Sequence, residues 1–182
     1  YGRADKGAAW ALLAKLYLNA EVYIGAPKYT ECITYCNKIT GAGYALESDY
    51  NKLFLTDNNK SAEMIFPITF DGTRTKTWGG MTFLVHAGVG GNMNPADFGI
   101  NGGWSGLRTT KALVQKFSDI TGATDRRAMF HTNGQKLDIS DIFTFNDGYA
   151  ITKYRNVSST GVKGTDTEGN FPDTDFPLFR LA

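Results

Sequence analysis

The sequence contains few of the residues from which metal and redox sites are built. Its 182 residues include two cysteines, Cys32 and Cys36, and two histidines, His86 and His131. The cysteines lie four positions apart on a predicted helix, where a disulfide would need irregular geometry and a zinc site would need two further ligands. We therefore expect both thiols to be small buried core residues. Neither histidine has the partner pattern of a metal site or a general base.

Charge of one sign and long apolar runs are also missing. Nineteen basic residues against 18 acidic ones give a net charge of +1. No cluster of lysines and arginines provides the footprint that a nucleic acid or an anionic membrane surface requires, so no nucleic acid partner is expected. The apolar run of residues 8–14 is much shorter than the roughly 20 residues of a membrane span. A neutral, polar ligand fits this composition best.

The sequence does hold a glycine-rich stretch with two of its three tryptophans. Residues 72–106 carry ten of the 21 glycines and almost no helical periodicity, which predicts irregular loops at the surface. Trp78 and Trp104 are flanked by glycines, which clear space beside each indole and let a ligand approach. This pattern favours a stacking platform. The alternative is that both rings merely pin loops to the core.

The N-terminal part predicts a helical hairpin. Residues 3–20 form the clearest helix and are apolar nearly all round, so we expect burial on most of its circumference. Gly25-Ala26-Pro27 breaks the chain, and a second amphipathic helix follows over residues 28–39. The pair has the size of one tetratricopeptide-type unit, which requires stacked neighbours to bury its faces.

The pattern changes after the hairpin. Residues 64–70 predict a β-like run that Pro67 confines to an edge, and residues 151–154 alternate like a strand. A short helix is expected over residues 110–117, and residues 175–182 predict the start of an amphipathic helix. The predicted fold class is mainly α, with tetratricopeptide-like helix pairs packed against an irregular loop-rich region that contains short β segments.

Several segments, in order along the whole chain, resemble the interior of the SusD/RagB family, especially its starch-binding branch. They are residues 2–20, Leu53–Asn58, Trp78-Gly79-Gly80, Asn101-Gly102-Gly103-Trp104 and the run from Pro172-Asp173-Thr174-Asp175 to Ala182. Members of this family are outer-membrane lipoproteins of Bacteroidetes that bind glycans without catalysis and sit on a TonB-dependent transporter. The resemblance implies the same surface location, partner and non-catalytic function for this protein.

The residue patterns along the chain, with which the resemblance agrees, give the expected domain limits. Residues 1–43 form the tetratricopeptide-like hairpin, residues 44–170 form a loop-rich glycan-binding region, and residues 171–182 begin a following helical repeat. Because the chain opens within helical sequence and stops within a predicted helix, we expect it to be a fragment of a longer protein.

The expected glycan site is centred on the two tryptophans. The resemblance implies that Trp78 and Trp104 belong to an arc of aromatic rings that cradles a curved, starch-like α-glucan, with Trp78 standing where the family pattern has tyrosine. Asn101 and Arg108 are the polar groups closest in sequence that could bond sugar hydroxyls.

A structural calcium ion is a further expectation from the resemblance. Its candidate ligands are Asp57 and Asn59 from an acidic loop and Asp173 and Asp175 from the Pro-Asp-Thr-Asp motif, since hard cations take several oxygen ligands. The alternative for all four is a solvated turn in which Asp57 caps its own backbone.

Two other functions remain open from the sequence. A glycoside hydrolase would use two carboxylates, and Asp71 and Asp97 lie near the tryptophans, although no motif supports them. A helical-repeat scaffold would bind protein partners along the hairpin, but that function leaves the two tryptophans unexplained.

Overall fold

The computed structural model describes all 182 residues. The chain divides into two compact units, each built from segments that are distant in sequence. Unit 1 comprises residues 1–48, 59–68 and 176–182, and unit 2 comprises residues 49–58 and 69–175.

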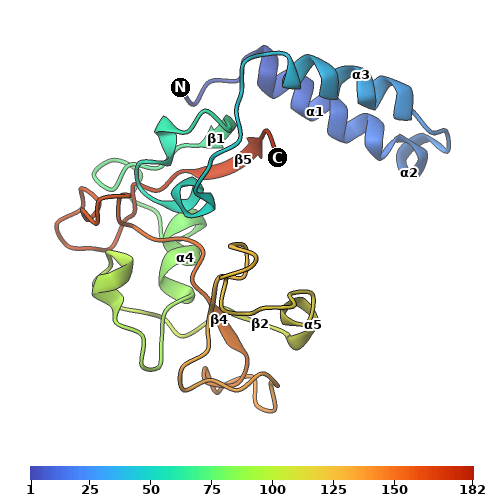
Figure 1. The fold of residues 1–182 in the computed structure, drawn as a ribbon. Coiled ribbons are helices and arrows are strands. Elements are labelled where there is room, and N and C mark those ends of the chain that lie inside the picture. The colour runs from blue at the N-terminus through green and yellow to red at the C-terminus, as the bar shows by residue number, and fades with distance from the viewer. The chain divides into compact units, whose positions relative to one another are not determined.

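A helical hairpin forms most of unit 1, at the blue end of the ribbon in Figure 1. It consists of α1 (Lys6–Leu18), α2 (Ala20–Ile24) and α3 (Tyr29–Thr40). The Asp5 carboxylate caps α1 by accepting a hydrogen bond from the Ala8 N–H at 2.9 Å, and Tyr17 stacks on Tyr35 with 5.6 Å between ring centroids. The two predicted helices are confirmed, with α2 as a short addition.

The expected burial of the hairpin is wrong. Only Gly7 and Ala8 of α1 are buried, while Cys32 is half-buried and Cys36 is exposed as free thiols. Helix α1 packs against α3, α2 and the strand β1 (Met64–Ile68), which leaves much of its apolar surface in solvent. Large exposed apolar side chains of the hairpin include Leu12, Leu16, Leu18, Val22, Tyr23, Ile24, Tyr29 and Ile33.

Strand β1 pairs antiparallel with β5 (Phe176–Arg180) in a two-stranded sheet, and the two lie side by side in Figure 1. The β1 prediction is confirmed, but the helix predicted to start within residues 171–182 is wrong. Proline is tolerated both in the first turn of a helix and in an edge strand, so Pro177 did not distinguish a helix from a strand here. The pairing of Pro67 with Pro177 places both prolines in a sheet whose two strands are both edges.

Unit 2 is mostly irregular and carries short elements between long loops. Its longest helix is α4 (Gly80–Ala87), so the expectation that residues 72–106 lack a helix is wrong. The helix expected over residues 110–117 is shortened to residues 111–114, and the strand expected over residues 151–154 is shifted to residues 149–151. The other short elements are η1 (Tyr50–Phe54), η2 (Asn58–Lys60, which spans the boundary between the units), η3 (Pro95–Phe98), α5 (Lys111–Val114) and a sheet of order β2-β4-β3, formed by Arg108–Thr109, Tyr149–Ile151 and Phe130–His131.

The class is therefore less helical than the mainly α prediction. One helix pair is present, so the tetratricopeptide-like repeat stays a prediction. The longest helices fall short of the length and apolarity that a bilayer crossing requires.

Candidate functional site

An aromatic cluster lies on unit 2 around the two predicted tryptophans. Trp78 is 60% exposed and Trp104 is 42% exposed, with 6.2 Å between their ring centroids and 44° between their planes. Phe171 lies 5.0 Å from Trp78, and Phe83 lies 6.4 Å from Trp104. We call these four side chains the aromatic platform. The structure thus brings together Trp78 and Trp104, and their role in binding a glycan stays a prediction.

Helix α4 positions the loop that carries Trp104. The Trp104 N–H donates to the His86 carbonyl at 2.8 Å, and the N–H groups of Gly106 and Leu107 donate to the Ala87 carbonyl at 2.9 and 2.6 Å. Carbonyls in the last turn of a helix have no partner within the helix. The loop satisfies them, and in return its backbone is fixed beside α4.

His86 supports Trp104 from below the exposed face. Its imidazole stacks on the indole with 4.7 Å between centroids and 22° between planes, and only 1% of the residue is exposed. Nδ1 lies 2.7 Å from the Gly102 carbonyl oxygen and Nε2 lies 2.9 Å from that of Asn170. A neutral ring donates to one of these oxygens and a doubly protonated ring to both. His86 thereby joins α4, the Trp104 loop and the segment before Phe171.

Asn101 and Arg108, the predicted hydroxyl-binding helpers, both make bonds within the chain. The Asn101 amide nitrogen donates to the Glu168 carbonyl at 2.9 Å and to the Asn170 Oδ1 at 2.8 Å. The Arg108 guanidinium donates to three backbone carbonyls, one of them that of Gly106. Their place in the structure supports positioning of the platform loops, and sugar contact stays a prediction for both.

Asp166 fixes the backbone of the segment that carries Phe171. Its Oδ2 accepts hydrogen bonds from the N–H groups of Asn170 and Phe171, each at 2.9 Å. Burial by itself raises the pKa of Asp166, but the N–H donors of Phe171, Asn170 and Glu168 outweigh burial and hold that pKa below its ordinary value. The carboxylate is therefore ionised at neutral pH and holds Phe171 beside Trp78.

Comparison with known proteins identifies the setting of this platform. No protein-family model matches the chain. Over 229 aligned residues the chain is 33% identical to the starch-binding protein SusD of Bacteroides thetaiotaomicron, and the match covers 100% of the chain. The chain is SusD-like along its whole length. It spans 41% of that relative's length.

Solved structures agree on the fold of the SusD-like chain. A SusD superfamily protein of Parabacteroides distasonis superposes with a TM-score of 0.66 at 21% identity, covering 99% of this chain and 38% of that one. A SusD superfamily protein of Bacteroides fragilis gives a TM-score of 0.60 at 18% identity, covering 98% of this chain and 38% of that one. The irregular loops of unit 2 are thus part of a fold that other proteins share.

The predicted calcium ligands of the SusD-like chain are not gathered into one site. Asp57 accepts hydrogen bonds from the N–H and hydroxyl of Ser159 at 2.9 and 2.6 Å, and Asn59 is exposed. Asp173 accepts from the Gly72 N–H at 2.6 Å and Asp175 from the Phe70 N–H at 2.7 Å. No group of three or more acidic, histidine or cysteine side chains able to hold a metal ion occurs in the chain. This arrangement does not fit calcium, because these carboxylates tie distant loops together instead.

Calcium is accordingly expected to leave the stability of the SusD-like protein unchanged. A bound ion would raise the melting temperature by mass action, since it would bind the folded state alone. We expect the same melting temperature in millimolar calcium and in excess chelator, measured by differential scanning calorimetry. A higher melting temperature in calcium than in chelator, lost in the Asp173→Asn variant, would contradict this expectation and support the metal site.

Two adjacent glycines offer a matched test of how Trp104 is held. A Cβ at Gly103 would lie 2.6 Å from the Val89 carbonyl carbon, whereas a Cβ at Gly102 would meet nothing within 4 Å. Backbone atoms cannot rotate away as a flexible side chain can. Gly103→Ala is therefore expected to displace the Trp104 loop, lower the melting temperature and weaken the binding of any ligand that stacks on the indole. Gly102→Ala should leave both properties near wild type. Calorimetry and ligand titration of the two variants check this, and equal behaviour of the pair would contradict it.

Sequence reasoning missed Phe83, His86 and Phe171. Phe83 and His86 are three positions apart on α4 and so share one helix face. The glycines on both sides of α4 indicated a loop, so the helix was not predicted. Phe171 directly precedes the Pro-Asp-Thr-Asp motif, which drew attention as a metal site. Its contact with Trp78 joins residues that are distant in sequence, and no local pattern indicates it.

Proposed function

We propose that the SusD-like chain is the glycan-binding part of a non-catalytic protein, and that its aromatic platform holds a neutral oligosaccharide. The observation that carries the proposal is the pair of half-exposed indoles, Trp78 and Trp104, which lie side by side, with the backbone of Trp104 held by its bond to the His86 carbonyl. A large aromatic face left in solvent offers apolar contact area to a ligand that has both apolar faces and hydroxyls. Sugar rings have this character.

A starch-like α-glucan is the favoured ligand. The name of the relative SusD supports this choice, since that protein is called starch-binding. The angle of 44° between the two indole planes also favours it, because rings that follow one another along a curved chain present their faces at an angle. A straight β-linked chain would favour coplanar indoles.

The same proposal places the protein at the outer-membrane surface of a bacterium, as a lipoprotein that delivers its glycan to a TonB-dependent transporter. Support for this part comes from the family resemblance alone. This location predicts that the protein fractionates with outer membranes and is released from them by detergent.

The two acids that lie near the tryptophans in sequence, Asp71 and Asp97, do not favour hydrolysis. A glycosidase needs a general acid whose pKa is raised. The hydroxyl of Thr73 and its backbone N–H instead hold the pKa of Asp71 below its ordinary value. Asp97 accepts a hydrogen bond from the Asn94 side chain at 3.0 Å within the same short turn. The pKa of Asp71 is thus shifted in the direction opposite to that which a general acid needs.

Titration of the whole protein with two glucan series tests the proposal. Isothermal titration is expected to detect binding of maltoheptaose and weaker or no binding of cellohexaose. A reducing-sugar assay on starch should show no release over the same period. Preference for the β-linked chain would overturn the ligand class, and release of reducing ends would favour the hydrolase.

A further inference from the structure

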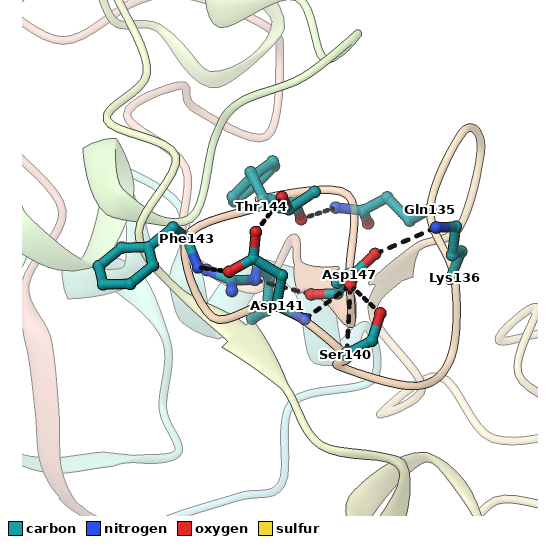
Figure 2. A network of polar contacts seen from close by, with 9 residues as sticks. Gln135, Lys136, Ser140, Asp141, Phe143, Thr144 and Asp147 are labelled. Carbon is teal, nitrogen blue, oxygen red and sulfur yellow. Dashed lines mark hydrogen bonds and ion pairs between the residues drawn. The ribbon is translucent and has the colours of Figure 1, made fainter.

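Another exposed aromatic ring lies on a loop whose backbone Arg108 joins to the backbone of the Trp104 loop. Phe143 is 91% exposed, and its neighbour Ile142 is 71% exposed. No other large apolar side chain of the chain is exposed to the extent of Phe143. In Figure 2 its ring points away from the polar network behind it.

A dense network holds the backbone of this loop (Figure 2). Asp141 accepts hydrogen bonds from the Phe143 N–H at 2.9 Å and from the Thr144 hydroxyl at 2.8 Å. Asp147, which is buried, accepts from the N–H groups of Ser140 and Asp141 at 3.1 and 3.0 Å. Its other oxygen lies 3.5 Å from the Lys136 ammonium. Phe143 is thus exposed to solvent on a backbone that hydrogen bonds hold in place.

The ionisation of these acids preserves the network at neutral pH. Bonds from the Ser140 hydroxyl and the Asp141 N–H lower the pKa of Asp147 to about 2. The Phe143 N–H and the Thr144 hydroxyl likewise lower the pKa of Asp141. Both groups are therefore carboxylates at neutral pH.

Arg108 connects this loop to the loop of Trp104. Its Nη1 donates to the Gly106 carbonyl at 3.1 Å, its Nη2 to the Ile142 carbonyl at 2.8 Å and its Nε to the Asp147 carbonyl at 2.8 Å. The guanidinium is a rigid planar fork, so it fixes the spacing of the carbonyls it joins. Gly106 follows Trp104 by two residues, at most about 7 Å of extended chain. Ile142 directly precedes Phe143.

We propose that Phe143 is an additional stacking position of the glycan site, contacted by the part of a long oligosaccharide that extends beyond Trp104. This inference rests on the proposed function. The occupant is the glycan, because one guanidinium bonds both the Ile142 carbonyl before Phe143 and the Gly106 carbonyl after Trp104, and because hydrogen bonds already hold the Phe143 backbone. Pre-ordering matters, since a loop that must be immobilised on binding loses part of the contact energy.

Oligosaccharide length separates this position from the platform itself. We expect Phe143→Ala in the whole protein to weaken maltoheptaose binding about fivefold or more, by analogy with stacked bases on aromatic rings. Maltotriose is expected to occupy the two tryptophans without extending to Phe143, so it should bind as it does to wild type. Tyr23→Ala is the matched control, since Tyr23 is also an exposed aromatic, at 63%, but lies on α2 of the hairpin.

The other outcomes overturn the inference. Unchanged maltoheptaose affinity with a lowered melting temperature would mean that Phe143 packs against another part of the protein. Unchanged affinity with unchanged melting, and loss of binding to a protein partner such as the transporter, would make the loop a protein contact. Equal losses for both sugars would place the ring within the platform. Failure of the proposed function looks different, because Trp104→Ala would then leave both affinities unchanged.

Discussion

Replacing Trp104 by alanine is expected to weaken maltoheptaose binding by on the order of 1 to 3 kcal/mol, or about five- to 150-fold, with the fold retained. The indole supplies stacking area but little core, since 42% of the residue is exposed. The backbone that carries it is held by its N–H bond to the His86 carbonyl at 2.8 Å, which alanine keeps. Loss of the ring therefore removes ligand contact more than stability.

Trp78→Ala should weaken binding by a similar factor, and the double variant should nearly abolish it. Isothermal titration measures the three affinities, and circular dichroism confirms folding of each variant. Tyr23→Ala serves as the control for loss of an exposed aromatic ring away from the platform. Wild-type affinity in both single variants would make the tryptophans structural and place the ligand elsewhere.

The largest expected loss of stability comes from Arg180→Met in β5. Arg180 Nη1 lies 2.6 Å from Glu63 Oε1, and the Glu63 side chain is only 3% exposed. The other carboxylate oxygen accepts from the Glu47 N–H at 2.8 Å. Removing the guanidinium leaves a buried charge without its ionic partner, which costs about 3 to 5 kcal/mol in comparable pairs. We expect a loss near the lower limit, because the Arg180 side chain is 25% exposed.

The double variant Glu63→Gln with Arg180→Met isolates the charge. It removes the buried carboxylate while keeping an acceptor for the Glu47 N–H, so it should regain most of the lost stability. Urea unfolding of the whole protein measures both variants. A single variant as stable as wild type would show that the ion pair does not hold β5 against β1, and a double variant no better than the single would show that charge is not the cause.

This ion pair also illustrates where sequence reasoning stopped. The hairpin helices were predictable because their apolar periodicity is local, and β1 because Pro67 marks an edge strand within a β-like run. Strand β5 was not, since its partner lies more than a hundred positions earlier in the chain. Only that partner, together with Glu63, makes an extended conformation of Phe176–Arg180 more stable than the helix that the local pattern favours.

The platform shows the same division. Exposure of Trp78 and Trp104 could be predicted from the flanking glycines, but Phe171 and His86 could not. Their contacts depend on buried polar residues that close long loops, among them Asn156, whose side chain accepts from the Asp173 N–H at 3.0 Å and donates to the Gly99 carbonyl at 3.1 Å. The acids predicted as calcium ligands also hold long loops together. The sequence could not show this, since a carboxylate that accepts backbone N–H bonds and one that binds a cation have the same sequence pattern.

A crystal structure of the whole protein with maltoheptaose tests the central claim most directly. We expect successive sugar rings to stack on the exposed faces of Trp78 and Trp104, with the ligand following the angle between the two indoles. Sugar density at another surface, with both indoles uncovered, would contradict the account.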